Sequence, residues 1–422
     1  MSERLTPEQV ELRDAVRELA RDRIAPRAAE IDERGEFPRD VVELLARHDV
    51  FALGYPTEYG GLGEPLLTNC LMIEEVSRVC ATSGLILAVQ ALGSLPLLLA
   101  GSDEQKRRWI PGLASGELLD AFALTEAGAG SDPAGIRTRA VRDDGGWRID
   151  GTKRFISHGS VADLVAVFAV TDPDAGRHRD LSCFYVERGM PGFEVSRLEH
   201  KMGIRGSPTA ELVFDGVRVP DANRVGAVGD GFRIAMRTLD RSRPGVAAQA
   251  VGIAQGATDA AVAYAKERVQ FGKPIRVLPA VGRLLLSMKV DLEATRALLA
   301  ETGRWVDLWK VYEKALGEGG ADADPALRAR HKQCQALAET LTPMVKYCPT
   351  EMGNRVCYQA MQVHGGVGYM REFNIERLFR DVRITNIYEG TSQLQVVAAI
   401  GKLLGRSLEP LLAEWEGLEY PA

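Results

Sequence analysis

The chain has 422 residues, a formal net charge of −6 at pH 7 and a pI of about 5.7. With 45% hydrophobic and 26% charged residues, it has the composition of a soluble globular protein of two or three domains. Its basic residues are spread along the sequence, which argues against nucleic-acid binding. The six cysteines show no CxxC spacing and the six histidines no HExxH motif. We therefore expect free thiols, a cytoplasmic protein and no dedicated metal site.

Residues 1–118 have the pattern of an all-α domain. Thr6 is placed to cap a first helix, with Pro7 at its first position and Gln9 completing a capping box. Further helical patterns cover residues 39–48, 68–79 and 103–117. The N-terminus has acidic residues and no apolar segment, so we expect neither a signal peptide nor a transit peptide.

The most apolar run, Ser83–Gly101, has no charged residue and resembles a membrane span by composition. Gly93 and Pro96 interrupt it, and charged segments follow on both sides. We therefore expect a buried helix, a turn and a second short helix, and no membrane association.

Residues 119–228 change to short segments rich in Val, Phe, Ile and Tyr, separated by Gly, Pro and Asp. This spacing predicts the strands of a small barrel or sandwich. The predicted strands lie within residues 147–157, 162–172, 181–189, 192–199 and 209–220.

Residues 229–422 return to helical periodicity, with helices expected at about 281–314, 326–341, 345–363 and 392–404. A polar, Gly-rich loop is expected at 317–325. A first helix carries small residues that allow close helix packing, in the stripe Val246, Ala250, Ile253, Ala257, Ala261 and Tyr264.

Four short motifs have an ordinary structural interpretation when each is taken alone. TEAGAGSD, within Phe122–Asp132, is either a ligand-binding loop or a Gly-rich connection, and it matches neither a Walker loop nor GxGxxG. KRFISHG, Lys153–Gly159, is a strand, and ERVQFGKPI, Glu267–Ile275, is a helix end. QVHGGVGY, Gln362–Tyr369, is a helix cap whose glycines are also suited to a phosphate.

Taken together and in this order, followed by ERLFRDVRITNIYEGTSQLQ at 376–395, the motifs closely resemble the acyl-CoA dehydrogenase family of flavoproteins. The resemblance extends from about Thr6 to Leu404. It implies an α+β multidomain fold: an N-terminal α-helical domain, a middle β-barrel-like domain and a C-terminal four-helix bundle. It also implies FAD as cofactor, an acyl-CoA substrate, an electron-transferring flavoprotein as acceptor and a homotetramer.

The resemblance implies FAD-binding residues in five segments. Arg268, Gln270 and Phe271 would reach the FAD of a neighbouring subunit. The other segments are Phe122, Leu124, Thr125, Gly130 and Ser131; Phe155, Ile156 and Ser157; Gln362, Val363, His364, Gly365 and Gly366; and Thr391, Ser392 and Gln393.

The chain differs from the family pattern within one of these segments and departs from it clearly after the FGKP motif. Many relatives have Trp and Thr where this chain has Phe155 and Ser157. Relatives often have a Gln six or seven residues after FGKP, where this chain has Leu278 and Pro279. One FAD contact between subunits is therefore missing or supplied elsewhere.

Glu389 lies between apolar helical patterns, where a carboxylate is costly unless it caps a helix or does chemistry. In relatives with Tyr-Glu-Gly-Thr, this Glu removes the α-proton of the acyl thioester. Other relatives place the base on an earlier helix, before an Arg. Here that position is Ser242, before Arg243, and a serine is unsuited to the role. Glu389 is therefore the predicted catalytic base, strengthened by desolvation.

The resemblance also implies how the reaction proceeds. The thioester oxygen would be held by the Glu389 backbone N–H and a ribityl hydroxyl of FAD. The β-hydrogen would leave as hydride to flavin N5. The residues implied for the substrate are Ser131, Gly84, Ala88, Arg243, Tyr388 and Gly390.

Small residues at Gly84 and Ala88, one helical turn apart, predict a bulky, long or cyclic acyl group. Medium-chain relatives have larger polar residues at these two positions. Glutaryl-CoA relatives have an Arg at the position of Gly84, so that substrate is disfavoured. The alternative is that a large side chain from another segment fills the space.

Several functions remain as alternatives. An acyl-CoA oxidase is the second enzyme candidate, although such oxidases often carry a further C-terminal domain. A decarboxylating or desulfinating variant and a non-catalytic flavin-binding scaffold are the others. Residues 308–333 form a longer hairpin than in typical relatives, either at a subunit interface or on the surface.

Overall fold

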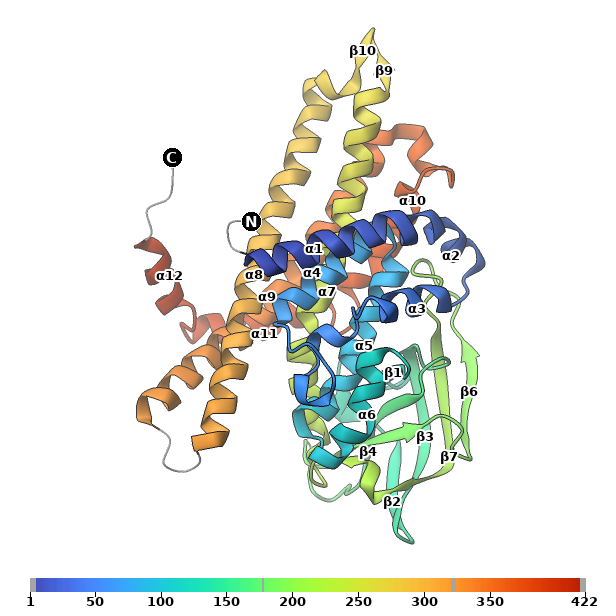
Figure 1. Ribbon diagram of the computed structural model, residues 1–422, viewed down its shortest axis with the longest axis vertical. Helices are drawn as coiled ribbons and strands as arrows, with labels where there is room; N and C mark the ends of the chain where they lie inside the picture. The colour runs from blue at the N-terminus through green and yellow to red at the C-terminus, as the bar shows by residue number, and fades with distance from the viewer. Residues whose placement is uncertain (1–4, 177, 320–323, 418–422) are drawn as a thin grey trace.

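The computed structural model describes residues 5–176, 178–319 and 324–417. Helices come first, then a sheet, then long helices (Figure 1). The predicted capping box at Thr6 and Gln9 is present, and Ser102 and Gln105 form a second one. The N-terminal helices are α1 (Pro7–Leu19), α2 (Ala28–Arg34), α3 (Arg39–Arg47), α4 (Leu66–Val79), α5 (Ala81–Ala100) and α6 (Asp103–Ser115).

The predicted break in the apolar run is wrong, because α5 continues through Gly93 and Pro96. Pro96 removes the N–H that would bond to Leu92 O, and burial inside the protein stabilises the helix despite this loss. Two other carbonyls of the same stretch accept hydrogen bonds from hydroxyl groups. Ser94 Oγ donates to Gln90 O at 2.9 Å, and Tyr185 OH donates to Gly93 O at 2.6 Å. Of the described helices, α5 alone is long and apolar enough to cross a membrane, and 61% of that stretch is buried inside the protein.

The middle of the chain forms one eight-stranded sheet in the order β6-β7-β3-β2-β4-β5-β8, with β1 added in parallel to β4. Alternate side chains of β3 and β7 are buried, as expected for strands with one covered face. The strands are β1 (Asp120–Ala123), β2 (Arg139–Asp143), β3 (Gly146–Ser157), β4 (Leu164–Val170), β5 (Leu181–Glu187), β6 (Phe193–Leu198), β7 (Thr209–Pro220) and β8 (Arg224–Val225).

Three long helices dominate the C-terminal part. The elements are α7 (Gly231–Glu267), a hairpin of β9 (Val269–Gln270) and β10 (Lys273–Pro274), α8 (Pro279–Gly319), α9 (Pro325–His364), α10 (Ile375–Val382), α11 (Ser392–Leu404) and α12 (Glu409–Glu416). In Figure 1 the β9–β10 hairpin stands at the top of the molecule.

The predicted division near residues 341–345 is wrong, because α9 is continuous through Pro343 and Pro349. Thr342 and Thr350 donate to carbonyls one turn earlier, Ala338 O and Lys346 O, both at 2.7 Å. Along its length α9 packs against α7 and α8, and such tertiary packing stabilises the helix despite its prolines. The expected loop 317–325 falls partly on residues 320–323, outside the described residues, while Gly317–Gly319 belong to α8.

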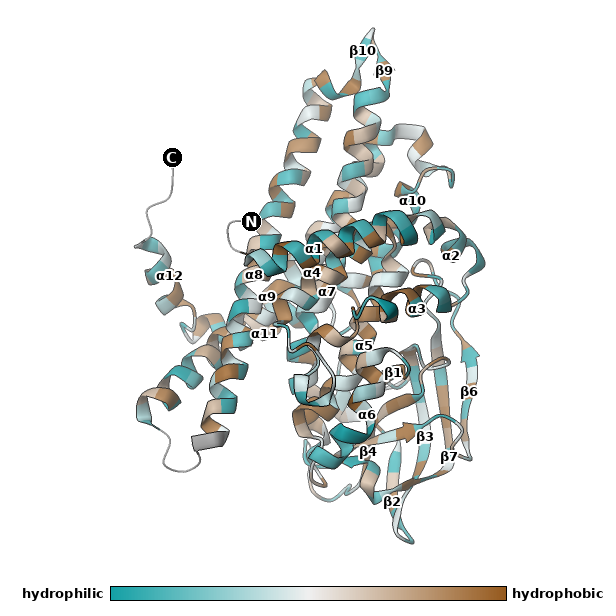
Figure 2. Ribbon diagram, in the orientation of Figure 1, coloured by the Kyte–Doolittle hydropathy of each residue, from teal (hydrophilic) through white to brown (hydrophobic). Residues whose placement is uncertain are grey.

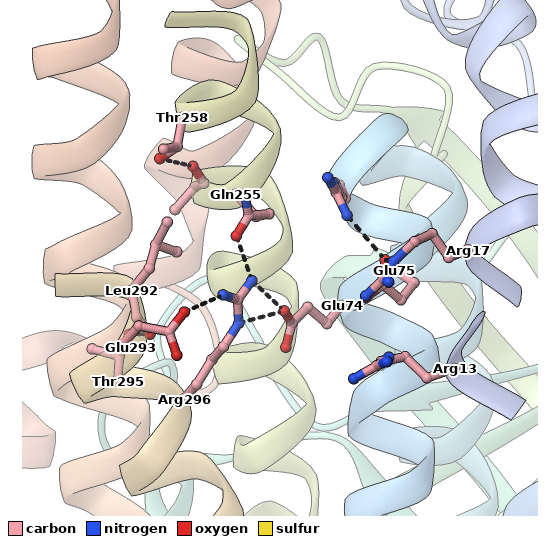
Figure 3. Close-up of polar contacts among 12 residues, drawn as sticks. Arg13, Arg17, Glu74, Glu75, Gln255, Thr258, Leu292, Glu293, Thr295 and Arg296 are labelled. Carbon is pink, nitrogen blue, oxygen red and sulfur yellow. Dashed lines mark hydrogen bonds and ion pairs between the residues drawn. The ribbon is translucent and has the colours of Figure 1, made fainter. Parts of the chain in front are cut away.

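Polar pairs join the N-terminal helices to the bundle. Arg296 of α8 contacts Glu74 of α4 at 2.7 Å and Gln255 of α7 at 2.7 Å (Figure 3). Arg17 of α1 contacts Glu75 at 2.7 Å. Burial raises the pKa of Glu74 even with this partner, so the pair fixes geometry more than it adds stability. Figure 2 shows α1 as mainly hydrophilic and α5 as mainly apolar.

The hairpin between α8 and α9 and the C-terminal helix α12 share one apolar core. Leu411 of α12 is buried with Trp305 and Trp309 of α8 and with Leu337 of α9. Glu313 of α8 binds the guanidinium groups of two α7 residues, Arg237 and Arg241. The hairpin therefore packs on the same chain at the first turns of α7.

Candidate active site

Glu389 lies in a turn just before α11 with backbone angles that side chains rarely adopt. Its φ is 54°, and that of Gly390 is 94°. Such a conformation costs about 1–3 kcal/mol at a non-glycine residue and persists only where surrounding contacts enforce it. Glycine at 390 is required by its own positive φ.

The Glu389 carboxylate meets α7. Ser242 Oγ donates to Glu389 Oε2 at 2.5 Å. Burial raises the pKa of Glu389, and the Ser242 hydroxyl and the cations of Arg243 and Lys346 oppose that rise. Glu389 as a whole has intermediate exposure. The turn is therefore partly open to solvent, whereas the carboxylate itself is enclosed.

The carbonyls of the turn are held by three side chains. Arg243 Nε donates to Glu389 O at 3.4 Å, and Gln395 Nε2 donates to Glu389 O at 3.3 Å and Gly390 O at 3.1 Å. Lys346 Nζ donates to Gly390 O at 2.8 Å. Within the described part of the chain, no acceptor is recorded for the Glu389 N–H. This donor is left for a ligand.

Flanking contacts fix the ends of the turn. The Tyr388 hydroxyl donates to Gln249 Oε1, and Ser392 Oγ donates to Glu351 Oε1. Asn386 Nδ2 donates to the same Glu351 oxygen at 2.9 Å. Thr391 is the N-cap residue of α11 but makes no capping bond with its side chain, which leaves its hydroxyl available.

Two of the predicted FAD segments are joined in the middle domain. Lys153 Nζ donates to Leu124 O at 3.0 Å and binds Glu126 Oε1 at 2.8 Å. Arg154 N donates to Thr125 O at 2.8 Å. Leu124 and Ile156 are buried beneath this junction.

The outer residues of these segments face solvent in the single chain. Phe155 has a φ of 59° and is 55% exposed. Gly130 and Ser131 are exposed, whereas Phe122, Thr125 and Ser157 are intermediate. An exposed aromatic side chain held in a strained conformation is the kind of surface that a planar ligand covers.

The glycine segment at the end of α9 is open on one side. A Cβ added at Gly365 or Gly366 would meet no atom within 4 Å. His364 packs inward, with its ring 4.7 Å from that of Tyr264 and Nδ1 2.8 Å from Ala360 O, and burial lowers its pKa. Gln362 is exposed and Val363 is buried, so only part of the segment faces outward.

The remaining cofactor and substrate residues are spread more widely. Arg268, Gln270 and Phe271 lie at the β9–β10 end of α7, and Phe271 is 88% exposed. Gln393 is exposed at the start of α11. Concavities of about 390 and 410 Å³ lie elsewhere, around Gln105 and around Lys201.

Gly84 has a packing role in this structure. A Cβ at Gly84 would lie 1.9 Å from Ser77 Oγ of α4, so the glycine lets α4 and α5 approach closely. Ala88, one turn on, is only partly buried. The lining of an acyl pocket by these two residues stays a prediction, and Gly84 by itself opens no space there.

Three residues whose side chains hold the backbone of the site were not predicted from the sequence: Lys346, Gln395 and Lys153. A lysine inside the apolar stretch TPMVKYCP was the available signal for Lys346. Ser242 was considered only as a base, yet the structure makes it the hydrogen-bond donor to Glu389.

Comparison with known proteins accounts for nearly the whole chain. The acyl-CoA dehydrogenase N-terminal domain matches residues 6–117, the middle domain 121–217 and the C-terminal domain 229–307 and 323–402. The chain belongs to the acyl-CoA dehydrogenase family. The predicted α-β-α fold is confirmed, and the protein is an oxidoreductase that acts on the CH–CH group of acyl-CoA.

Among similar acyl-CoA dehydrogenases, one of Bacillus subtilis (strain 168) is 41% identical over 95% of this chain and 99% of its own length. The cyclohex-1-ene-1-carbonyl-CoA dehydrogenase of Geobacter metallireducens is also 41% identical, over 92% of this chain and 96% of its own length.

Solved structures of similar proteins have the same fold. Butyryl-CoA dehydrogenase from Megasphaera elsdenii has a TM-score of 0.85 and 34% identity, over 95% of this chain and 99% of that one. A chain from work on the electron transferring flavoprotein of Acidaminococcus fermentans has a TM-score of 0.86 and 35% identity, over 95% and 98%.

Proposed function

We propose that this acyl-CoA dehydrogenase converts an acyl-CoA into the 2-enoyl-CoA, with Glu389 as the base that removes the α-proton. One observation carries the proposal: a carboxylate with a raised pKa stands beside a backbone N–H that has no protein acceptor among the described residues. A general base is most effective when its pKa lies near the pH at which the enzyme works. The N–H is suited to stabilise the negative charge that develops on the thioester oxygen.

The residues of the candidate site fit FAD. Exposed Phe155 and the available hydroxyls of Thr125, Ser157 and Thr391 offer stacking and hydrogen bonds. The open backbone at Gly365 and Gly366 offers N–H groups without side-chain obstruction. When bound, FAD supplies the acceptor for the β-hydrogen, as hydride at N5.

A homotetramer is part of the proposal because the FAD-binding residues are dispersed. Arg268, Gln270 and Phe271 are exposed at a hairpin that lies apart from α11, the helix that follows Glu389 (Figure 1). Their position favours contact with a cofactor bound by another subunit. Electron transfer to an electron-transferring flavoprotein is proposed with this arrangement, supported by the similar Acidaminococcus fermentans chain.

For the substrate we keep a bulky, long or cyclic acyl group, with Arg243, Tyr388, Gly390 and Ser131 around the thioester and Ala88 along the acyl chain. The Geobacter metallireducens relative, named for a cyclic acyl-CoA, supports this choice. The Megasphaera elsdenii structure, named for butyryl-CoA, supports a short one. Because Ser77 of α4 occupies the space beside Gly84, only Ala88 of these two small residues still supports a wide acyl pocket.

The test is an anaerobic panel of acyl-CoA thioesters read by flavin absorbance, with Glu389→Gln and the exposed control Glu372→Gln. Glu389→Gln should retain FAD and bind acyl-CoA, yet reduce flavin at least about 10²-fold more slowly, because the general base is lost. Glu372→Gln should match the wild type. Normal flavin bleaching by Glu389→Gln would refute the assignment of the base, and butyryl-CoA as best substrate would refute the substrate class.

The same panel separates the alternatives. Hydrogen peroxide formed during aerobic turnover would indicate an acyl-CoA oxidase. Carbon dioxide or sulfite released from a suitable thioester would indicate a decarboxylating or desulfinating variant.

A further inference from the structure

We propose that Lys346 is a positioning residue, whose ammonium holds the Gly390 carbonyl so that the Glu389 turn keeps its N–H free for the thioester oxygen. The inference rests on the proposed function. It concerns a residue of α9, which contributes no residue to the predicted base or oxyanion donor.

Lys346 is fully buried. The only hydrogen bond recorded for Nζ in the described part of the chain is the one to Gly390 O at 2.8 Å. No carboxylate of a described residue lies within 4 Å as an ion-pair partner. A buried ammonium is costly without a close counter-charge, so a purely structural role would favour an apolar residue here.

The bond from Lys346 is the shortest of those that hold the turn. Glu389 O accepts hydrogen bonds from Arg243 at 3.4 Å and from Gln395 at 3.3 Å, and Gly390 O accepts one from Gln395 at 3.1 Å. Because peptide units are planar, holding these carbonyls fixes the backbone on the C-terminal side of Glu389. On the other side of Glu389, Tyr388 is held by its hydroxyl bond to Gln249 and by its N–H bond to Ile384 O. With both ends held, Glu389 keeps its positive φ of 54°, and its N–H and side chain keep their direction.

The surroundings of Lys346 match this role. Burial lowers its pKa to about 8, while the nearby carboxylates of Glu389 and Glu351 favour the charged form and Arg243 opposes it. A charged donor makes the stronger hydrogen bond to a carbonyl. The turn is therefore held by a cation that is sensitive to the charge state of the base beside it.

Lys346→Met tests the inference, because it keeps a long buried side chain but removes the donor. The matched control is Lys289→Met at an exposed site on α8. A 3-oxoacyl-CoA is the probe, since its acidic α-proton lets the bound enolate be followed by its own ultraviolet absorbance. We expect the apparent pKa of the bound probe to rise by about one unit, a tenfold loss of enolate.

Anaerobic flavin reduction by Lys346→Met should slow by about tenfold, less than for direct loss of an oxyanion donor. FAD content and the Kd for the 2-enoyl product should stay within about twofold of wild type, since positioning affects developing charge more than ground-state binding. Lys346→Gln, which retains an N–H donor, should fall between Met and wild type. Lys289→Met should change nothing.

An unchanged enolate pKa in a folded Lys346→Met enzyme would overturn the inference. If that variant does not fold, Lys346→Leu, which also removes the donor, decides, and a wild-type enolate pKa in it also overturns the inference. Glu389→Gln serves as a separate reference. If Glu389→Gln is inactive while Lys346→Met is normal, only the role of Lys346 fails; if Glu389→Gln remains active, the proposed function fails.

Discussion

Ser242 and Glu389 are 147 residues apart in the chain, yet their side chains are joined by a hydrogen bond of 2.5 Å. These are the two positions at which the family resemblance places a base. The fold therefore brings both positions to one point, and the chain fills one with a carboxylate and the other with a hydroxyl. A hydroxyl that donates to a carboxylate favours its charged form.

Ser242→Ala should raise the pKa of Glu389 further, because burial then acts with one less opposing hydrogen bond. The base must be deprotonated to act, so the acid limb of the flavin-reduction rate should move to higher pH. Ser242→Thr keeps the hydroxyl and should retain the wild-type profile. The measurement is the anaerobic reduction rate across pH. The same profile in Ser242→Ala and wild type would contradict the assigned hydrogen bond.

At the scale of elements, glycines set how closely α7 lies to α4. A Cβ at Gly252 would lie 2.2 Å from Glu74 O, and one at Gly256 would lie 2.2 Å from Arg78 O. Most of the predicted small-residue stripe of α7 is buried on another side of the helix, where Ile253, Ala257 and Ala261 share a core cluster with residues of α8 and α9. The close approach of α7 to α4 places the Arg296–Glu74–Gln255 network and orients the helix that carries Ser242 (Figure 3).

Gly252→Ala should therefore destabilise the protein by about 1–3 kcal/mol, the range for overpacking, because backbone on α4 must move. Gly317→Ala is the control, since Gly317 lies in α8 with nothing within 4 Å of the added Cβ. That change should stabilise slightly through helix propensity. Apparent melting temperature compares the two. A Gly252→Ala protein as stable as Gly317→Ala would show that α4 and α7 are not tightly packed.

At the scale of the whole molecule, the single chain leaves apolar and cofactor-binding residues exposed. Phe271 is 88% exposed at the β9–β10 hairpin, and Val397 and Leu404 are exposed on α11. Large exposed apolar side chains in groups mark surfaces that other chains cover. The proposed homotetramer gives these surfaces a partner and completes the FAD site.

Phe271→Ala should release FAD more readily, because a residue supplied to a neighbouring subunit's cofactor is lost. Dilution should lower flavin retention in this variant more than in wild type. Light scattering with flavin absorbance on a sizing column measures assembly and retention together, with Val311→Ala, exposed on α8, as control. A monomeric wild-type protein with full FAD would contradict the shared site.

The sequence by itself determined the α-β-α order, the capped first helix, the strand region and the family, because capping, period-two and period-3.6 patterns and short motifs are local properties. Tertiary structure alone decided that α5 and α9 continue through their prolines, since packing against neighbouring elements stabilises both helices. It also decided that Ser242, Lys346 and Gln395 meet at Glu389. Contacts between segments more than 100 residues apart, such as that of Ser242 with Glu389, leave no periodic trace in either segment, so only the folded chain reveals them.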